Sequence, residues 1–265
     1  MEVIKIGGAA GVQADALCRD LAGQEGADYL LVHGGSAATN DISIKLGKTP
    51  KMFLSPSGHE SRYTDAETIE IFTMVCAGKV NKELVQALQQ NGINAVGLSG
   101  LDGRIVAGKR KKTVRAMENG KIKIIRNDYS GMITDINTKL LEQLLDNGYL
   151  PVVGPPAISE EGYAINVDAD RMAAAVAVKM QAERLIILSN VPGLLEDPED
   201  EGSLISRIPA DRITEYRKYA KGRMGKKLLA AEEAIAGGVN EVILGDAGVC
   251  NPVTEARKKK GTVIS

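Results

Sequence analysis

The sequence is poor in the residues that build aromatic cores, metal sites and disulfide frameworks. Its 265 residues include no Trp, 2 Phe and 2 His. An aliphatic core of Val, Ile, Leu, Ala and Met is therefore expected. Two histidines, His33 and His59, are too few for a His-rich metal site and do not favour a hydrolytic triad. The 3 cysteines, Cys18, Cys76 and Cys250, show no CxxC spacing, which favours buried free thiols over disulfides or a metal site.

Long apolar runs and a strong net charge are also missing. A membrane-spanning helix needs about 20 predominantly apolar residues, and no stretch of the sequence approaches that length. The opening residues, MEVIKIGG, predict a strand that begins at once, without the basic and apolar regions of a signal peptide. A cytoplasmic location is therefore expected. The net charge of −1 provides no global field that would attract nucleic acid.

Several common catalytic motifs are absent. The sequence contains no Walker A motif, no GxGxxG after a strand, no HExxH and no GxSxG. The segment nearest to Walker A, GRMGKK (222–227), has glycines only three residues apart and ends in Lys rather than Ser or Thr. The sequence therefore gives no support for a P-loop, and little for a dinucleotide site.

What the sequence does contain is a regular alternation of short apolar runs and longer amphipathic stretches. The apolar runs predict strands at 3–6, 29–35, 94–100, 149–156, 184–190 and 241–246. The amphipathic stretches predict helices at 14–22, 36–46, 65–90, 135–147, 168–181 and 224–237. Ser36 is the expected cap of the second helix. This alternation predicts an α/β fold with a mainly parallel central sheet covered by helices on both faces.

The segment 103–130 departs from this alternation. It contains RIVAG, KTVRAM and KIKIIR, which alternate as strands do, with a hairpin turn expected at 118–120. The sequence shows neither an internal repeat nor a flexible linker. We therefore expect one domain, 1–265, with two lobes of about 1–154 and about 155–265 that meet near the GPP at 154–156.

Two lysines beside glycine-containing turns, Lys5 and Lys227, are the first candidates for a site. Lysine binds phosphate as a compact point charge, and glycines let backbone N–H groups approach phosphate oxygens. In a parallel sheet, ligands bind outside the carboxyl ends of the strands, where KIGG, HGGS, GLSGLDG and SNVPG all fall. Each motif alone also has a purely structural explanation: a tight turn, close packing of the backbone, or, for GRMGKK, a solvated basic face.

A second candidate is the segment INVDAD at 165–170, which precedes a strongly helical run. One Asn or Asp at a helix start is usually only a cap. Three polar acceptors in alternation, Asn166, Asp168 and Asp170, exceed what one cap needs and favour a site.

The third candidate is the basic run, Lys109, Arg110, Lys111 and Lys112. Eight cations fall between residues 109 and 126, and Glu118 alone offsets them. Charge runs are usually solvated faces, but this asymmetry favours a docking patch for an acidic partner. Nucleic acid is the rival interpretation, and the paired strands offer no aromatic side chains for base stacking.

Taken in order, KIGG, LLVHGGS, SRYTD, VGLSGLDG, INVDAD, LSNVPGLL and GRMGKK resemble the amino acid kinase family over essentially the whole chain. Within it, the resemblance is to the acetylglutamate kinase branch. It is closer still to the LysW-aminoadipate and LysW-glutamate kinases, which phosphorylate the distal carboxylate of an amino acid tethered by its amino group to a small acidic carrier. The resemblance implies an open three-layer αβα sandwich, MgATP as phosphoryl donor, a homodimer, and a place in lysine or arginine biosynthesis.

The resemblance also implies roles for individual residues. Lys5 and Lys227 would stabilise the transferring phosphoryl group, and Asp170 would orient both lysines. The acceptor would be bound by Gly35, Ser36, Arg62 and Asn166. Gly7 and Gly8 would offer N–H groups to the ATP phosphates, and Ser189, Asn190 and Gly193 would also bind ATP. The basic run would dock the carrier. No protein metal site is implied, because Mg²⁺ would be held through the ATP phosphates.

Two departures bear on the substrate. Acetylglutamate kinases typically have HGGG, where this chain has Ser36, and usually have Asn where it has Asp168. Both departures argue against free N-acetylglutamate, which stays the alternative. Ser36 and the basic hairpin favour the carrier-linked acceptor. A non-catalytic amino-acid-binding regulator with the same fold is a more remote one. Aminoadipate and glutamate differ by one methylene, worth only about 1–3 kcal/mol in a pocket, so the sequence does not separate them.

Overall fold

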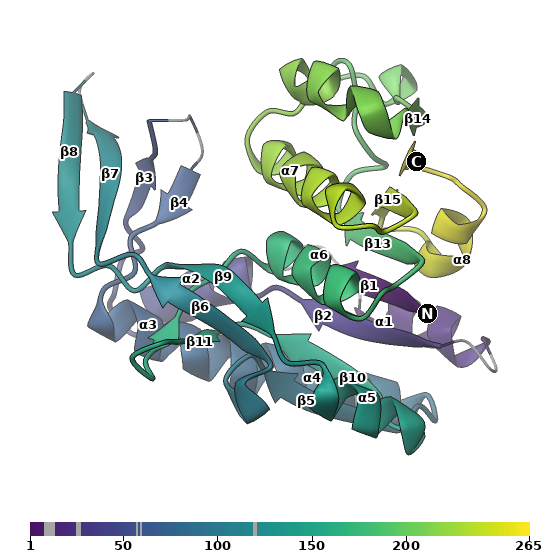
Figure 1. The fold of residues 1–265 in the computed structure, drawn as a ribbon, viewed down its shortest axis with the longest axis horizontal. Coiled ribbons are helices and arrows are strands. Elements are labelled where there is room, and N and C mark those ends of the chain that lie inside the picture. Colours follow the sequence, from purple (N-terminus) through teal and green to yellow (C-terminus); the bar gives the residue numbers. More distant parts are fainter. Residues whose placement is uncertain (8–13, 25–27, 57, 59, 119–120) are drawn as a thin grey trace.

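A computed structural model describes residues 1–265 of the chain, except 8–13, 25–27, 57, 59 and 119–120. An eight-stranded sheet runs through its centre in the order β14–β16–β15–β13–β1–β2–β10–β5 (Figure 1). These strands are β1 (Glu2–Ile6), β2 (Tyr29–His33), β5 (Ala95–Ser99), β10 (Leu150–Gly154), β13 (Arg184–Ser189), β14 (Arg207–Ile208), β15 (Glu241–Asp246) and β16 (Thr262–Ile264). Neighbouring strands are parallel except β15 and β16, which confirms the predicted mainly parallel sheet.

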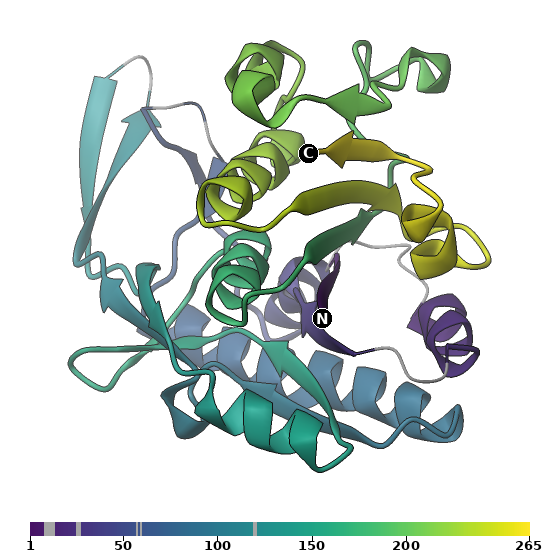
Figure 2. The ribbon, with the colours of Figure 1, turned by 45° about the vertical axis from the view of Figure 1, so that its right-hand side comes forward.

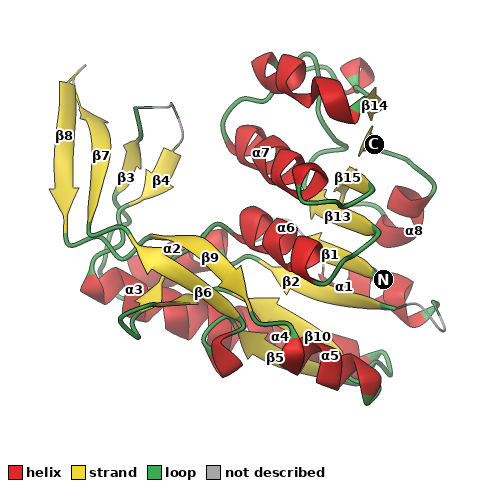
Figure 3. Ribbon diagram, in the orientation of Figure 1, coloured by secondary structure: helices red, strands yellow, loops and turns green. Residues whose placement is uncertain are grey.

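Helices cover both faces of this sheet (Figure 3). Along each strand successive side chains point to opposite faces, so Val3 belongs to one buried cluster and Ile4 to the other. The first cluster is completed by helices α5 (Lys139–Asp146), α6 (Ala169–Lys179) and α7 (Arg223–Ala236). The second is completed by α1 (Ala14–Ala22), α4 (Asn81–Gln90) and α8 (Pro252–Arg257). The three-layer αβα sandwich is therefore confirmed.

Two smaller sheets extend the N-terminal half. One has the order β12–β11–β6–β9 and the other the order β4–β3–β7–β8. Their strands are β3 (Met52–Leu54), β4 (Glu60–Arg62), β6 (Val106–Arg110), β7 (Thr113–Glu118), β8 (Lys121–Arg126), β9 (Gly131–Ile136), β11 (Ala157–Ser159) and β12 (Ala164–Ile165). Figures 1 and 2 show β7 and β8 standing apart from α7 and the C-terminal half. The predicted β7–β8 hairpin is confirmed, although 119–120 of its turn lie outside the described residues.

One predicted helix was partly wrong. The helix expected at 135–147 begins only at Lys139, because residues 131–136 form β9. This strand pairs antiparallel with β6, and the β-branched Ile133, Thr134 and Ile136 suit such a ladder. The lobe boundary near 154–156 stays a prediction. Beyond it, β11 still pairs with β6, so the chain remains in the N-terminal half until α6 begins.

The helical segment 65–90 has an unusual centre. Asp65 caps α3 (Ala66–Thr73) by accepting a hydrogen bond from the Thr68 amide at 2.8 Å. A wide π-helical turn, η1 (Met74–Val80), then joins α3 to α4. Such turns often mark functional sites, and this one is followed by Asn81, whose buried side chain reaches the central sheet.

Candidate active site

A cleft of about 1080 Å³ lies at the carboxyl ends of the central strands and is lined from both halves of the chain. Lys5 reaches it from β1, Arg62 from β4, and Asn166 from the segment after β12. Asp170 reaches it from the first turn of α6, and Lys227 reaches it from the second turn of α7. The structure therefore brings together residues that are more than 200 positions apart in the sequence.

Lys5 and Lys227 both contact Asp170, and we call these three residues the triad. The Lys5 amine lies 2.5 Å from Asp170 Oδ1, and the Lys227 amine lies 3.1 Å from Oδ2 and 3.3 Å from Oδ1. All three residues are buried, with exposed fractions of 4%, 8% and 8%. Asp170 thus holds both lysine heads at one point, as the sequence-based roles require.

The triad carries two positive charges and one negative charge. Burial alone would raise the pKa of Asp170, but the charges of Lys5 and Lys227 outweigh it and hold that pKa well below its usual range. Burial and the charge of Lys5 lower the pKa of Lys227, although Asp170 opposes this. A buried excess of one positive charge is unfavourable without a counterion, so the triad is suited to bind an anion.

Asp168 acts as the cap of α6. Its Oδ1 accepts hydrogen bonds from the amides of Asp170 at 3.0 Å and Arg171 at 3.2 Å. The Lys226 amine also lies 3.9 Å from Asp168 Oδ2. Asp168 therefore fixes the helix turn from which Asp170 projects.

The glycines after β2 lead directly into helix α2 (Ser36–Lys45). Gly35, not Ser36, is the cap residue, so that detail of the prediction was wrong. Ser36 is instead the first helical residue, and its backbone carbonyl and hydroxyl accept hydrogen bonds from Arg62. A Cβ atom at Gly35 would lie 2.5 Å from Cys76 Sγ, so glycine is required there for packing. The result is a helix N-terminus open to the cleft, which suits an anion.

Arg62 lies against the start of α2. Its Nη2 donates to the Ser36 carbonyl at 2.9 Å and to Asn40 Oδ1 at 2.7 Å. Its Nε is buried and, within the described part of the chain, has no hydrogen-bond partner. The Arg62 side chain lines the cleft, and its planar guanidinium matches the geometry of a carboxylate ligand.

Asn166 is oriented by a neighbouring hydroxyl. Thr64 Oγ1 donates its proton to the Arg62 carbonyl at 3.2 Å, so it must accept the hydrogen bond from Asn166 Nδ2 at 3.0 Å. This fixes the direction of the Asn166 amide group. Asp128, which is fully buried, holds the surrounding turns by accepting from the amides of Thr64 at 3.1 Å and Ser130 at 2.7 Å.

His33 belongs to a paired polar cluster beneath the site. Its Nε2 lies 3.0 Å from Asn81 Nδ2, and its Nδ1 lies 3.1 Å from the Gly34 carbonyl. Asn81 Nδ2 also donates to the carbonyls of Leu98 at 3.1 Å and Val152 at 3.0 Å, tying α4 to β5 and β10. Burial lowers the pKa of His33 to about 4, so the ring is neutral near pH 7. His33 has a structural role here.

The residues expected to bind ATP differ in where they lie and in whether their N–H groups are available. Gly7 lines the cleft, but its amide donates to the Leu188 carbonyl at 3.0 Å. The expectation that this N–H is offered to phosphate was therefore wrong, because it continues the β1–β13 ladder. Gly8 lies outside the described residues. Ser189, Asn190 and Gly193 line the cleft at the end of β13.

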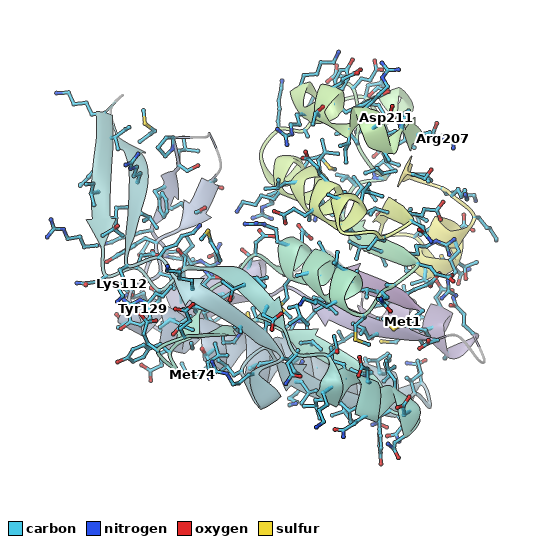
Figure 4. The ribbon with its side chains drawn as sticks, in the orientation of Figure 1. Met1, Met74, Lys112, Tyr129, Arg207 and Asp211 are labelled. Carbon is cyan, nitrogen blue, oxygen red and sulfur yellow. The ribbon has the colours of Figure 1, made fainter. Side chains whose placement is uncertain are left out.

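The four residues of the basic run point in different directions. Arg110 stacks on the Tyr129 ring at 3.5 Å and donates to the Asp128 carbonyl at 2.8 Å. Lys112 lies 3.1 Å from Glu161, and Figure 4 shows it beside Tyr129 at the outer margin, away from α6 and α7. Lys109 is exposed, whereas Lys111 lines the cleft. Docking through this run stays a prediction, but the four side chains do not form one uniform patch.

Sequence reasoning missed part of the site. Asp128 and Thr64 were not candidates, since single polar residues in DYSG and RYTD carry no spacing that marks them. The ion pair of Arg171 with Glu233, whose shortest contact is 2.6 Å, joins α6 to α7 and was also missed. The available signal for Arg171 was its place in the sequence, directly after the candidate residue Asp170. Of the cysteines, Cys18 and Cys76 are buried and free as predicted, but Cys250 is exposed.

Two further findings concern the described residues. No group of three or more His, Cys, Asp or Glu side chains among them could hold a metal ion. No helix among them is both long enough and apolar enough to cross a membrane.

The chain is similar to known proteins along its whole length. A model of the amino acid kinase family matches residues 1–246. The chain is 54% identical to a LysW-aminoadipate kinase of Deinococcus radiodurans, covering 100% of this chain and 91% of that protein. It is 50% identical to a LysW-aminoadipate kinase of Thermus thermophilus, covering 100% of both. Among solved structures, smu.665 from Streptococcus mutans has a TM-score of 0.75 and 25% identity, covering 100% of this chain and 98% of that one.

Proposed function

Because the chain belongs to the amino acid kinase family, we propose that it transfers the γ-phosphoryl group of ATP to the distal carboxylate of a carrier-linked α-aminoadipate. The observation that carries this proposal is the buried triad with its excess positive charge, beside the open N-terminus of α2. The full-length similarity to LysW-aminoadipate kinases supports the choice of acceptor. Carrier-linked glutamate is the second acceptor within the proposal.

The chemistry follows from the charges. A carboxylate oxygen of the acceptor attacks the γ-phosphorus, the bond from phosphorus to the bridging oxygen of ADP breaks, and the products are an acyl phosphate and ADP. Lys5 and Lys227 stabilise the negative charge spread over the transferring group, and Asp170 keeps their heads together. The acceptor is already ionised at pH 7, so no general base is needed. This agrees with the neutral, buried His33.

The acceptor would lie between α2 and the Asn166 segment. The N-terminus of α2 would receive the distal carboxylate, next to the triad. The position of the Arg62 guanidinium in the cleft wall supports binding of the α-carboxylate. Asn166 Nδ2 is engaged by Thr64, which leaves Oδ1 to accept an N–H. An amino group that is tethered through an amide offers one such N–H.

ATP would lie along the C-terminal half, beside Ser189, Asn190 and Gly193. Asp170 is already shared by two lysines, so we assign the Mg²⁺ ion to the ATP phosphates. The ion would supply charge neutralisation and orient the phosphates. An acidic carrier as partner is part of the proposal, and the homodimer and the cytoplasmic location stay predictions.

An acceptor panel tests the proposal. The protein is incubated with MgATP and either carrier-linked aminoadipate, carrier-linked glutamate or free N-acetylglutamate, and the acyl phosphate is trapped as a hydroxamate. We expect the highest kcat/KM with a carrier-linked acceptor. A higher kcat/KM with free N-acetylglutamate would replace the proposal by an acetylglutamate kinase. Absence of ATP turnover with all three would favour a non-catalytic binding protein.

A further inference from the structure

We infer that Lys111 is a specificity-determining residue, which binds an anionic group of the carrier close to its amide link with the acceptor. This inference rests on the proposed function and adds a second anion subsite to the cleft, separate from the triad. It also separates Lys111 from its neighbours in the basic run.

The position of Lys111 follows from strand register. Arg110 pairs with Gly131, and the next residue, Lys111, donates its amide to the Ser130 carbonyl at 2.8 Å. Ser130 in turn forms a parallel bridge with Asn166. Directly paired residues project to the same face of a sheet. Lys111, Ser130 and Asn166 therefore form one row, and all three line the cleft.

The neighbouring residues confirm this alternation. Arg110 stacks on Tyr129, which is the residue before Ser130, so this contact lies on the opposite face of the sheet. Lys112 reaches Glu161 at the outer margin. Lys109 shares the face of Lys111 by register but does not line the cleft, so Lys111 is the member of the basic run placed beside the acceptor residue Asn166 in the cleft.

The opposite wall of the cleft is also positive near Lys111. Desolvation in the cleft, together with the charges of Arg171 and Lys226, lowers the pKa of Lys111, although Asp128 acts in the other direction. Arg171 is already paired with Glu233, and Lys226 lies near Asp168. Within the described ranges, no carboxylate lies at ion-pair distance from the Lys111 amine. One further anion would therefore balance the charge of the Lys111 amine.

The acceptor side of the cleft identifies the anion. Lys111 lies in the row of Asn166, which would receive the tethered amide, whereas the predicted ATP residues lie at the end of β13. The two carboxylates of aminoadipate are assigned to the triad side and to Arg62. A third anion must therefore come from the carrier chain, and a carboxylate next to the amide link fits. Free N-acetylglutamate has no such group.

Direct binding gives a test that does not depend on turnover. N-succinyl-aminoadipate and N-butanoyl-aminoadipate have acyl groups of similar length, but only the first carries a terminal carboxylate there. Calorimetry should show about tenfold tighter binding of the N-succinyl compound to the wild-type protein, because of one additional charge pair. Lys111→Gln should remove that preference. Lys112→Gln, which loses the same charge outside the cleft, should keep it.

Steady-state kinetics give the second test. With carrier-linked aminoadipate, Lys111→Gln should raise the acceptor KM about tenfold and leave the KM for ATP and kcat nearly unchanged. Lys111 is exposed at the cleft surface, so an unchanged unfolding midpoint serves as the folding control. A rise in the KM for ATP instead would assign Lys111 to the nucleotide and overturn the inference.

The two proposals fail in different ways. Equal binding of both N-acyl compounds by the wild-type protein, or a preference that survives Lys111→Gln, overturns the Lys111 subsite even if the carrier-linked acceptor is phosphorylated. Lack of phosphorylation of every carrier-linked acceptor by the wild-type protein overturns the proposed function, whichever compound binds more tightly.

Discussion

Two buried polar clusters lie at the end of strands β1 and β2, and they differ in how their charges are balanced. The His33–Asn81 cluster is neutral, and its ring nitrogens and Asn81 amide have partners at 3.0–3.1 Å. The triad of Lys5, Asp170 and Lys227 has close contacts too, but it retains one uncompensated positive charge. The neutral cluster has its hydrogen bonds without a ligand, whereas the triad is completed only by an anion.

This difference predicts opposite costs of mutation. A satisfied buried network contributes to folding, since loss of one member leaves the others unpaired. A site with excess charge is held at some cost to stability and contributes to function. We therefore expect substitutions in the triad to lower activity more than stability. Substitutions in the His33–Asn81 cluster should lower stability more than activity.

The largest expected effect is that of Lys227→Met on catalysis. Removal of one cation that stabilises the transferring phosphoryl group should lower kcat by about 10²–10³-fold or more. The remaining Lys5–Asp170 pair is electrically balanced, so the free energy of unfolding should not fall. The measurements are hydroxamate formation and urea unfolding of the same preparation. A loss of several kcal/mol in unfolding free energy would contradict the assignment of the triad as a functional, charge-strained site.

The next effect is that of Asn81→Ala on stability. The substitution leaves His33 Nε2 and the carbonyls of Leu98 and Val152 without their shared donor. Unsatisfied buried groups cost about 1–3 kcal/mol each, so we expect about 2–4 kcal/mol of destabilisation in urea unfolding. Asn147→Ala, which removes an exposed Asn at the C-terminal cap of helix α5, is the matched control and should have little effect. If Asn81→Ala lowers kcat as strongly as Lys227→Met, the distinction between the clusters fails.

The smallest effect is a pH dependence that should belong to His33. Its pKa is about 4 in the folded protein and about 6.5 in the unfolded chain. As the pH falls from 6.5 to 4, the unfolded chain takes up a proton that the folded protein does not. The free energy of unfolding should therefore decrease on acidification by up to about 1.4 kcal/mol per pH unit in this window.

The control for this prediction is His33→Gln, which has no group that titrates there. Urea unfolding at pH 7, 6 and 5 should show a smaller loss of stability in the variant than in the wild type. Equal losses in both proteins would mean that His33 is not held neutral by its surroundings.

Sequence reasoning predicted that Lys5, Asp170 and Lys227 lie together, and the structure places them in contact. Lys5 lies near the carboxyl end of β1, and the carboxyl ends of parallel strands meet at one edge. The order of motifs through the chain then placed Lys227 and Asp170 beside it. The same reasoning predicted the αβα layers, since apolar runs and amphipathic stretches differ in period.

What could not be read from the sequence depends on contacts between distant segments. Residues 135 and 136 were included with a helix because pairing with β6, not local periodicity, makes 131–136 a strand. Gly7 was assigned to phosphate because its ladder partner, Leu188, lies far along the chain. The opposite directions of Lys111 and Lys112 follow from register with Ser130, which charge alone does not reveal.

The central position of β1 has a consequence for synthesis of the protein. Its five residues pair on one side with β2, which follows soon afterwards, and on the other side with β13, near residue 185. Pairings of such long sequence separation form late and slow the folding of a domain. A nascent chain that ends before α6 already contains Arg62 and Asn166, but it lacks both Asp170 and Lys227. The triad can therefore form only after Lys227 has been synthesised and has left the ribosome.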